Sequence, residues 1–286
     1  DELRGDAFVT AEPSNADIRV GGIIITAPNG LVLLTNQYQP NAALSTGDIF
    51  LIGELGVLSI TLLSPALIPN IVGSGTSFIA DSRNSFVADS QINSSSNVGN
   101  GGQINLFAKG DILLEEGVSF ISCPSTDCEG SLDRISRGGS IRLSANGDIL
   151  LSGSDSLETV VGLLTDGGEI QLSAENLLLG NFSSITSFNT GSETGGDISI
   201  RVDDKFMING GNIGTIVRPD ARGDGGKIFI ETNELVLSGT IAEDSLLSSS
   251  DFSTGFLTGG DITTDTIGAG AAGDININAN QIRVLN

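Results

Sequence analysis

The sequence predicts an all-β protein, a parallel β-helix in which each repeat forms one coil of a solenoid. Three observations predict it. A pair of glycines followed by apolar residues at alternate positions recurs along the chain, residues of the same type fill the same column in successive copies, and polar residues stand between them. Alternation with period two is typical of strands with one buried face. A sheet wrapped into a tube, with its core inside and water outside, accounts for all three.

The copies are identified by the last glycine of each pair and by the isoleucine two residues after it. These glycines are Gly102, Gly139, Gly168, Gly196, Gly226, Gly260 and Gly273, which stand 37, 29, 28, 30, 34 and 13 residues apart. The isoleucines are Ile104, Ile141, Ile170, Ile198, Ile228, Ile262 and Ile275. Because like residues can stack from coil to coil, we expect Ile170, Ile198 and Ile228 inside the solenoid. Their neighbours Gln171, Ser199 and Phe229 should point outward.

Residues 101–286 form the regular array. After a short corner, a second strand follows the first, with the inward pairs Ile112/Leu114, Ile149/Leu151, Leu177/Leu179, Phe206/Ile208, Leu235/Leu237 and Ile282/Val284. Third strands are expected around Ile121, Ile185, Ile213 and Ile241. Length variation then falls in segments 122–137, 153–166, 187–194, 215–224 and 243–258. Insertions at one phase of a solenoid project from one side of it.

Residues 1–100 are less regular, and we interpret them as β-helix coils with insertions, continuous with the later array. Strand-like runs flank the corner Pro28-Asn29-Gly30, and another unit opens at Gly47. Phe78–Ser82 and Phe86–Ser90 are a local duplication, which predicts two strands around a polar bend. Together the two parts predict roughly ten coils.

Composition and charge exclude several classes of function. The 286 residues include 35 acids and 13 bases, for a net charge of −22, which repels nucleic acid and anionic membrane surfaces. No apolar run is long enough to span a bilayer. Because there is neither an initiator Met nor a signal peptide, and no evident cap on the last strand, we expect a processed or excised piece of a longer protein.

The chain has no histidine, which excludes a Ser-His-Asp triad, an imidazole metal ligand and a histidine acid or base. Its only cysteines are Cys123 and Cys128. Two thiols make a poor zinc site, and the spacing is not that of a Cys-x-x-Cys motif. A disulfide that closes one projecting loop in an oxidising compartment is the favoured interpretation. Two unpaired thiols are the alternative.

Acidic residues give no specific catalytic or metal motif. Because neighbours in a strand point to opposite faces, neither Glu115-Glu116 nor Asp203-Asp204 forms a pair on one surface unless it lies at a corner. Arg218, Arg222, Asp220 and Asp224 are the nearest approach to the basic and acidic cluster of a calcium-dependent polysaccharide lyase. Solvated loop charge is the simpler interpretation. The segment 220–226 also alternates acids and glycines, but it lacks the sustained repeat of calcium-binding β-rolls. We therefore expect no catalytic residues, no cofactor and no specific metal site.

The repeat Gly-Gly-x-Ile-x-Leu-x-Ala, followed by Asp-Ile-Leu-Leu or Asn-Leu-Leu-Leu and then by Ser-Ile-Thr-Ser, resembles the filamentous haemagglutinin-like exoproteins. The stretches that carry it lie within residues 101–122, 138–151, 167–187, 195–215 and 225–241. The resemblance implies a right-handed parallel β-helical shaft, exported by an outer-membrane partner transporter and acting in adhesion. The family's secretion domain carries an Asn-Pro-Asn-Gly turn, whereas this chain has Ala27-Pro28-Asn29-Gly30. We therefore interpret the chain as shaft.

These observations favour a non-enzymatic structural or adhesin module, extracellular or at the outer-membrane surface. Its recognition surfaces, if it has any, are expected on projecting loops that meet a host-cell, cell-surface or glycan receptor. The alternatives are a polysaccharide-binding or polysaccharide-cleaving β-helix protein and a calcium-dependent secreted module.

Overall fold

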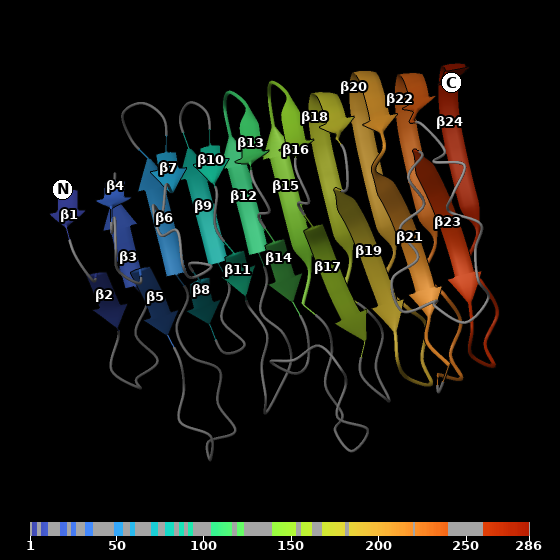
Figure 1. The fold of residues 1–286 in the computed structure, drawn as a ribbon, viewed down its shortest axis with the longest axis horizontal. Helices are drawn as coiled ribbons and strands as arrows, with labels where there is room; N and C mark the ends of the chain where they lie inside the picture. Colours follow the sequence, from blue (N-terminus) through green and yellow to red (C-terminus); the bar gives the residue numbers. More distant parts are fainter. Residues whose placement is uncertain are drawn as a thin grey trace.

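A computed structural model gives the arrangement of the chain. It describes strand backbones within residues 1–100 and then residues 104–115, 119–122, 139–152, 156–161, 168–180, 183–219, 221–239 and 260–285. Throughout these residues the regular structure is β-strand, without a helix. The strands lie side by side from the N-terminal to the C-terminal end of the molecule (Figure 1). The all-β part of the sequence prediction is confirmed.

The strands stack in three parallel ladders, each of which takes one strand from every repeat. The first ladder holds β3 (Ile18–Gly21), β6 (Ile49–Gly53), β9 (Phe78–Ser82), β12 (Ile104–Ala108), β15 (Ile141–Ala145) and the first halves of β18 (Ile170–Leu179), β20 (Ile198–Asn209), β22 (Ile228–Ser238) and β24 (Ile275–Leu285). The second ladder holds β7 (Leu58–Ile60), β10 (Phe86–Ala88), β13 (Ile112–Glu115), β16 (Ile149–Ser152) and the second halves of those four long strands.

The third ladder holds β2 (Ala7–Thr10), β5 (Val32–Asn36), β8 (Asn70–Gly73), β11 (Gln91–Asn93), β14 (Ser119–Ser122), β17 (Ser156–Val161), β19 (Ser184–Asn189), β21 (Asn212–Val217) and β23 (Asp261–Thr266). A separate parallel pair joins β1 (Glu2–Arg4) to β4 (Ile24–Thr26). All pairings are parallel and join equivalent repeats, which is a solenoid-like arrangement consistent with a parallel β-helix. The duplicated segments at 78–90 supply a first and a second strand, β9 and β10.

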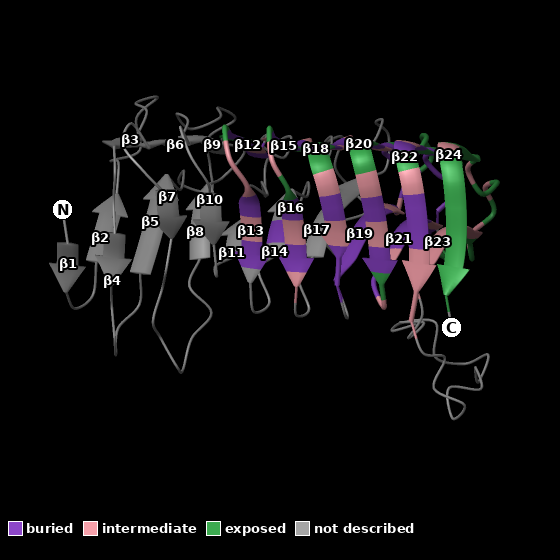
Figure 2. Cartoon of the chain, turned by 90° about the horizontal axis from the view of Figure 1, so that it is seen from above, coloured by how far each residue is buried: buried purple, intermediate pink, exposed green. Residues whose placement is uncertain are grey.

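The predicted isoleucine column is confirmed. Ile170, Ile198 and Ile228 are register partners in the first ladder, and each is fully buried. The residues between the buried positions face outward, and Phe229 is 41% exposed. Buried and more exposed positions alternate along the first-ladder segments from β12 to β22. Figure 2 shows buried bands on the strands as far as β22, whereas β24 is exposed. The core therefore runs inside the ladders as continuous aliphatic columns.

The assignment of the last repeats was wrong. The segment that begins at Gly260 is not a first strand, because β23 pairs with β21 in the third ladder and aligns Ile262 with Ile213. The next first strand is the opening half of β24, where Ile275 pairs with Ile228. The spacings of 34 and 13 residues therefore belong to one long repeat. Ile241, expected in a third strand, lies outside the described residues, and β23 occupies the place beside β21.

The segment 153–166, expected as a projecting loop, contains the third strand β17, which pairs with β14 and β19. Two other expected loops are shorter than predicted, because β19 extends to Asn189 and β21 to Val217. Around Ile121 the strand is confirmed, but the inward residue is its neighbour Phe120. Phe120 is fully buried and aligns with Leu157 of β17.

The double glycine has a steric cause. A Cβ on Gly226 would overlap the carbonyl oxygen of Gly196, and a Cβ on Gly273 would overlap that of Gly226. The close stacking of these corners thus admits no side chain. Hydroxyls of the third strands stabilise the same corners, since Thr215 Oγ1 donates to the Gly226 oxygen at 2.9 Å and Thr264 Oγ1 to the Gly273 oxygen at 2.8 Å.

Strand β24 closes the described ladders with one side uncovered. Its residues continue the inward columns, yet Ile275 is 40% exposed and Val284 is 71% exposed. Ile198 and Ile228 occupy the same column as Ile275 in the two preceding strands, and both are fully buried. Burial in this column therefore requires a neighbouring coil on each side.

Candidate functional site

The two cysteines, Cys123 and Cys128, lie outside the described residues, so their bridge stays a prediction. If they form a disulfide, oxidised protein should show no free thiol until it is reduced. A bridge that closes so short a loop removes little chain entropy, about 2 kcal/mol. Reduction should therefore leave the β-rich circular dichroism spectrum unchanged. Thiol titration of the native protein checks this, and two reactive thiols in oxidised material would contradict it.

Two of the charged groups in the segment around residue 220 have contacts of their own. The Arg218 guanidinium stacks on the Phe188 ring, 4.7 Å from its centroid. Asp224 accepts a hydrogen bond at 2.8 Å from the backbone N–H of Ala271 in the next repeat. Arg222 is exposed, and Asp220 lies outside the described residues. Arg218 thus contributes to stacking and Asp224 to corner geometry.

The acidic doublets behave as surface residues where they are described. Asp203 and Asp204 are exposed, and Asp204 accepts a hydrogen bond from the Asn233 side chain at 3.4 Å. The side chains of Glu115 and Glu116 lie outside the described residues. In the part of the chain that the structure describes, no three Cys, Asp or Glu side chains gather as a metal site. Nor does any helix there have the length and apolar character needed to cross a membrane.

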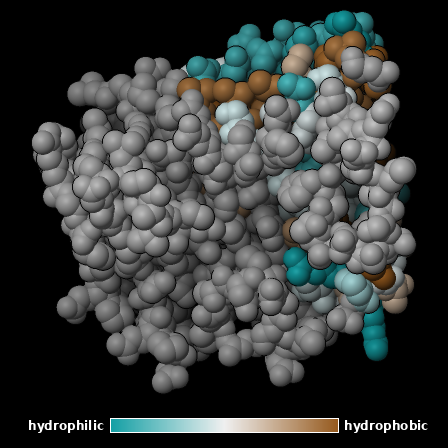
Figure 3. Space-filling view, viewed as in Figure 1, coloured by the Kyte–Doolittle hydropathy of each residue, from teal (hydrophilic) through white to brown (hydrophobic). Residues whose placement is uncertain are grey.

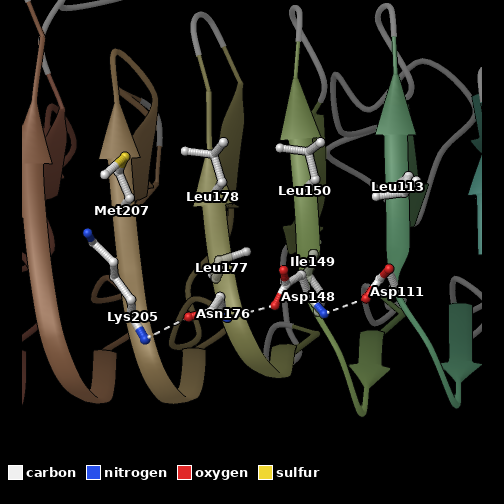
Figure 4. A pocket seen from close by; sticks show the side chains of 10 residues that line it. All are labelled: Asp111, Leu113, Asp148, Ile149, Leu150, Asn176, Leu177, Leu178, Lys205 and Met207. Atoms are coloured by element: carbon white, nitrogen blue, oxygen red, sulfur yellow. Dashed lines mark hydrogen bonds between the residues drawn. The ribbon is translucent and has the colours of Figure 1, made fainter. Parts of the chain in front are cut away.

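A concave surface lies on the outside of the second ladder. It is a groove of about 380 Å³ whose floor carries an outward row, Leu113, Leu150, Leu178 and Met207. These four residues are register partners on β13, β16, β18 and β20, so the row crosses four neighbouring strands (Figure 4). Each is half-buried. We call this feature the outer groove.

A chain of polar groups borders the outer groove where the second strands begin. The Asp111 carboxylate accepts from the Asp148 backbone N–H at 2.9 Å, and the Asp148 carboxylate accepts from the Asn176 amide at 2.8 Å. The Asn176 side-chain oxygen then accepts from the Lys205 backbone N–H at 3.2 Å. These links hold neighbouring corners in line. The groove is therefore bordered by side chains that are already fixed by hydrogen bonds.

Hydrophobic and hydrophilic surfaces lie next to each other along the upper edge of the described part (Figure 3). The second-ladder strands lie on that side of the molecule (Figure 2). The outer groove combines an apolar row with polar lining residues, an arrangement that suits an amphipathic ligand.

Sequence reasoning missed the outer groove. The second strands were interpreted as alternating, with a wet outer face. Yet five of them carry uninterrupted apolar triplets, at 112–114, 149–151, 177–179, 206–208 and 235–237. A triplet places its middle residue outside when the flanking two point inward. That signal could have identified the row.

One carboxyl group stands out electrostatically. Burial raises the pKa of Asp261 above its ordinary value of 3.8, against the opposing effect of a hydrogen bond from the Ile262 backbone. Asp261 is the register partner of Asn212, whose side-chain oxygen is buried and has no hydrogen-bond donor.

Replacing Asp261 with asparagine is therefore expected to stabilise the protein at neutral pH. An acid whose pKa is raised in the folded state favours folding at low pH, and this contribution is lost as the pH rises through the folded-state pKa. Urea unfolding of Asp261→Asn and wild type from pH 3 to pH 7 checks the sign. The advantage of the variant should grow with pH. A constant difference across the range would contradict a titrating Asp261.

Comparisons with protein-family models, with curated proteins and with solved structures return no match to this chain.

Proposed function

We propose that this chain is a right-handed parallel β-helical shaft of roughly ten coils that serves as a non-enzymatic structural or adhesive module. The observation that supports this most is the in-register stacking of the aliphatic columns, which join every described repeat to its neighbours through three ladders. Such stacking makes an extended, rigid scaffold. The resemblance of the repeats to filamentous haemagglutinin-like exoproteins supports a secreted or outer-membrane surface location and export by a partner transporter.

Recognition of a host-cell, cell-surface or glycan receptor is assigned to insertions between the strands. Segments 122–137 and 243–258 are the long connections that follow β14 and β22. Segment 153–166 is withdrawn from this role, because the third strand β17 (Ser156–Val161) lies within it. Segment 243–258 lies at the corner between the second and third strands. In the preceding repeat that corner is short, since only two residues connect β20 to β21. Length at the 243–258 connection is therefore not required for strand pairing.

Replacing 243–258 with a short glycine-containing turn is expected to preserve the fold and to reduce binding to cells or immobilised glycans. The residues that remain between Ser238 and Asp261 are enough to bridge the corner, since β20 and β21 need fewer. Circular dichroism and thermal unfolding check the fold, and adhesion of labelled protein checks binding. Unchanged adhesion in this variant, and in one shortened at 122–137, would place recognition elsewhere.

The alternative function, cleavage of acidic polysaccharides, is tested in the same preparations. A lyase releases unsaturated sugars that absorb ultraviolet light, so turnover is measured with and without calcium. We expect none. Robust product formation that is lost in Arg222→Ala would overturn the shaft proposal in favour of the enzyme.

A further inference from the structure

The outer groove is matched in shape to a ridge of apolar side chains. Its row crosses four strands, and neighbouring strands lie about 4.8 Å apart, so the row is about 14 Å long. An amphipathic α-helix has a pitch of about 5.4 Å, and each turn contributes an apolar side chain to the ridge along one face. A helix lying along the row can therefore place one apolar side chain near each strand over about three turns.

The lining chemistry favours a peptide over a sugar. The row consists of three leucines and Met207, and no aromatic ring lines the groove on which a sugar could stack. Leucine and methionine are the side chains that line grooves for amphipathic helices, because methionine adapts its shape to the partner. The apolar lining thus specifies one face of the ligand.

The charges beside the row specify the other face. The charged residues that line the groove are Asp111, Asp148 and Lys205, at the corners that precede the second strands. Two of these three are acids, so the border carries a net charge of −1, on a chain whose net charge is −22. Lys205 is in turn paired with Glu234, at 3.7 Å. An anionic border attracts a ligand with cationic flanks.

We propose that the outer groove binds a cationic amphipathic helix, presented by a partner protein or peptide, with its apolar ridge on Leu113, Leu150, Leu178 and Met207 and its lysines or arginines toward the acidic border. This adds a partner class to the proposed shaft and does not depend on adhesion through the insertions. The two proposals can fail separately. The chain can act as a shaft without binding a helix in the groove, and it can bind a helix there without adhering to cells.

The test uses the whole chain and a labelled synthetic peptide of about 14 residues, built from leucine and lysine with the leucines on one helical face. A peptide of the same pattern with glutamate in place of lysine is the charge control. We expect saturable binding of the lysine peptide, weakened by salt, and binding of the glutamate peptide at least about tenfold weaker. Fluorescence anisotropy measures both.

The decisive variants leave the charge of the protein unchanged. Leu178→Gln removes part of the apolar row and should weaken binding of the lysine peptide about tenfold. Its control is Ser173→Gln, on the exposed outer face of the first half of the same strand. That variant should bind like wild type. Met207→Gln is a second neutral change in the row and should act like Leu178→Gln, with circular dichroism confirming that each variant is folded.

Three results would overturn the inference. The lysine peptide fails to bind, or Leu178→Gln and Met207→Gln both bind it as tightly as wild type, which would mean attraction by overall negative charge alone. In the third result, a linear uncharged oligosaccharide binds the wild-type protein but not the two variants, while peptide binding is the same in all three. That result would assign the groove to a glycan. Cell adhesion is not a readout here, so failure of the shaft proposal remains distinguishable.

Discussion

Replacing Ile198 with aspartate is expected to unfold the coils around it. Ile198 is fully buried between its register partners Ile170 and Ile228. The substitution removes the burial of a large aliphatic side chain and places a carboxyl group where no hydrogen-bond partner is available. The two effects together should lower the free energy of unfolding by about 4 kcal/mol or more. Urea unfolding followed by circular dichroism measures the change.

Two controls carry the same aspartate. Ser199→Asp places it one residue along β20 on the outer face and should change stability by less than about 0.5 kcal/mol. Ile275→Asp places it in the same inward column, but in β24, where the isoleucine is already 40% exposed. This variant should lose less than Ile198→Asp. If Ile198→Asp and Ser199→Asp were equally tolerated, the inward assignment of the isoleucine column would be refuted.

The inward columns could be predicted from sequence because a single physical requirement sets them. A strand with one buried face shows its apolar residues every second position, and parallel stacking repeats the same residue type from coil to coil. The isoleucines of the column from Ile104 to Ile228 satisfy both conditions. The strands, their parallel pairing and their buried face could therefore be predicted from them. The two strands in the duplicated segments at 78–90 could be predicted for the same reason.

The last repeats could not be assigned in this way, because the Gly-Gly-x-Ile pattern serves two different corners. Gly211 precedes a third strand and Gly226 precedes a first strand, yet both are followed two residues later by isoleucine. Strand pairing decides between them. Thr264 gave a clue, because it breaks the apolar rule of a first strand. It aligns with the buried Thr215, and both hydroxyls donate to glycine carbonyls.

Strand β17 and the outer groove were missed for a related reason. In β17 the third-ladder column holds Leu157 instead of isoleucine, and the strand was assigned to a loop because no isoleucine marked it. The outward row of the groove was missed because a wet outer face was assumed for every strand. Which outward residues gather into a groove depends on strands that are distant in the sequence. The raised pKa of Asp261 depends likewise on burial, which only the assembled ladder provides.

Replacing Gly226 with alanine is the second exchange with a large expected effect. The added Cβ would overlap the carbonyl oxygen of Gly196 and approach its carbonyl carbon, and both are backbone atoms of the neighbouring repeat. Backbone held in a ladder cannot move aside as the end of a flexible side chain can. The corner must shift, which also disturbs the 2.9 Å hydrogen bond that Thr215 donates to the Gly226 oxygen. We expect a loss of about 3 kcal/mol or more in the free energy of unfolding.

The matched control is Gly214→Ala, in the third-ladder strand β21. A Cβ there would meet no atom closer than the Thr263 hydroxyl oxygen at 3.4 Å, which lies on a side chain. Alanine costs less conformational entropy than glycine on folding, so this variant should be neutral or gain up to about 1 kcal/mol. Thermal and urea unfolding of both variants would separate steric overlap from a general effect of losing a glycine. Equal destabilisation of the two would show that close stacking of the glycine carbonyls does not govern the motif.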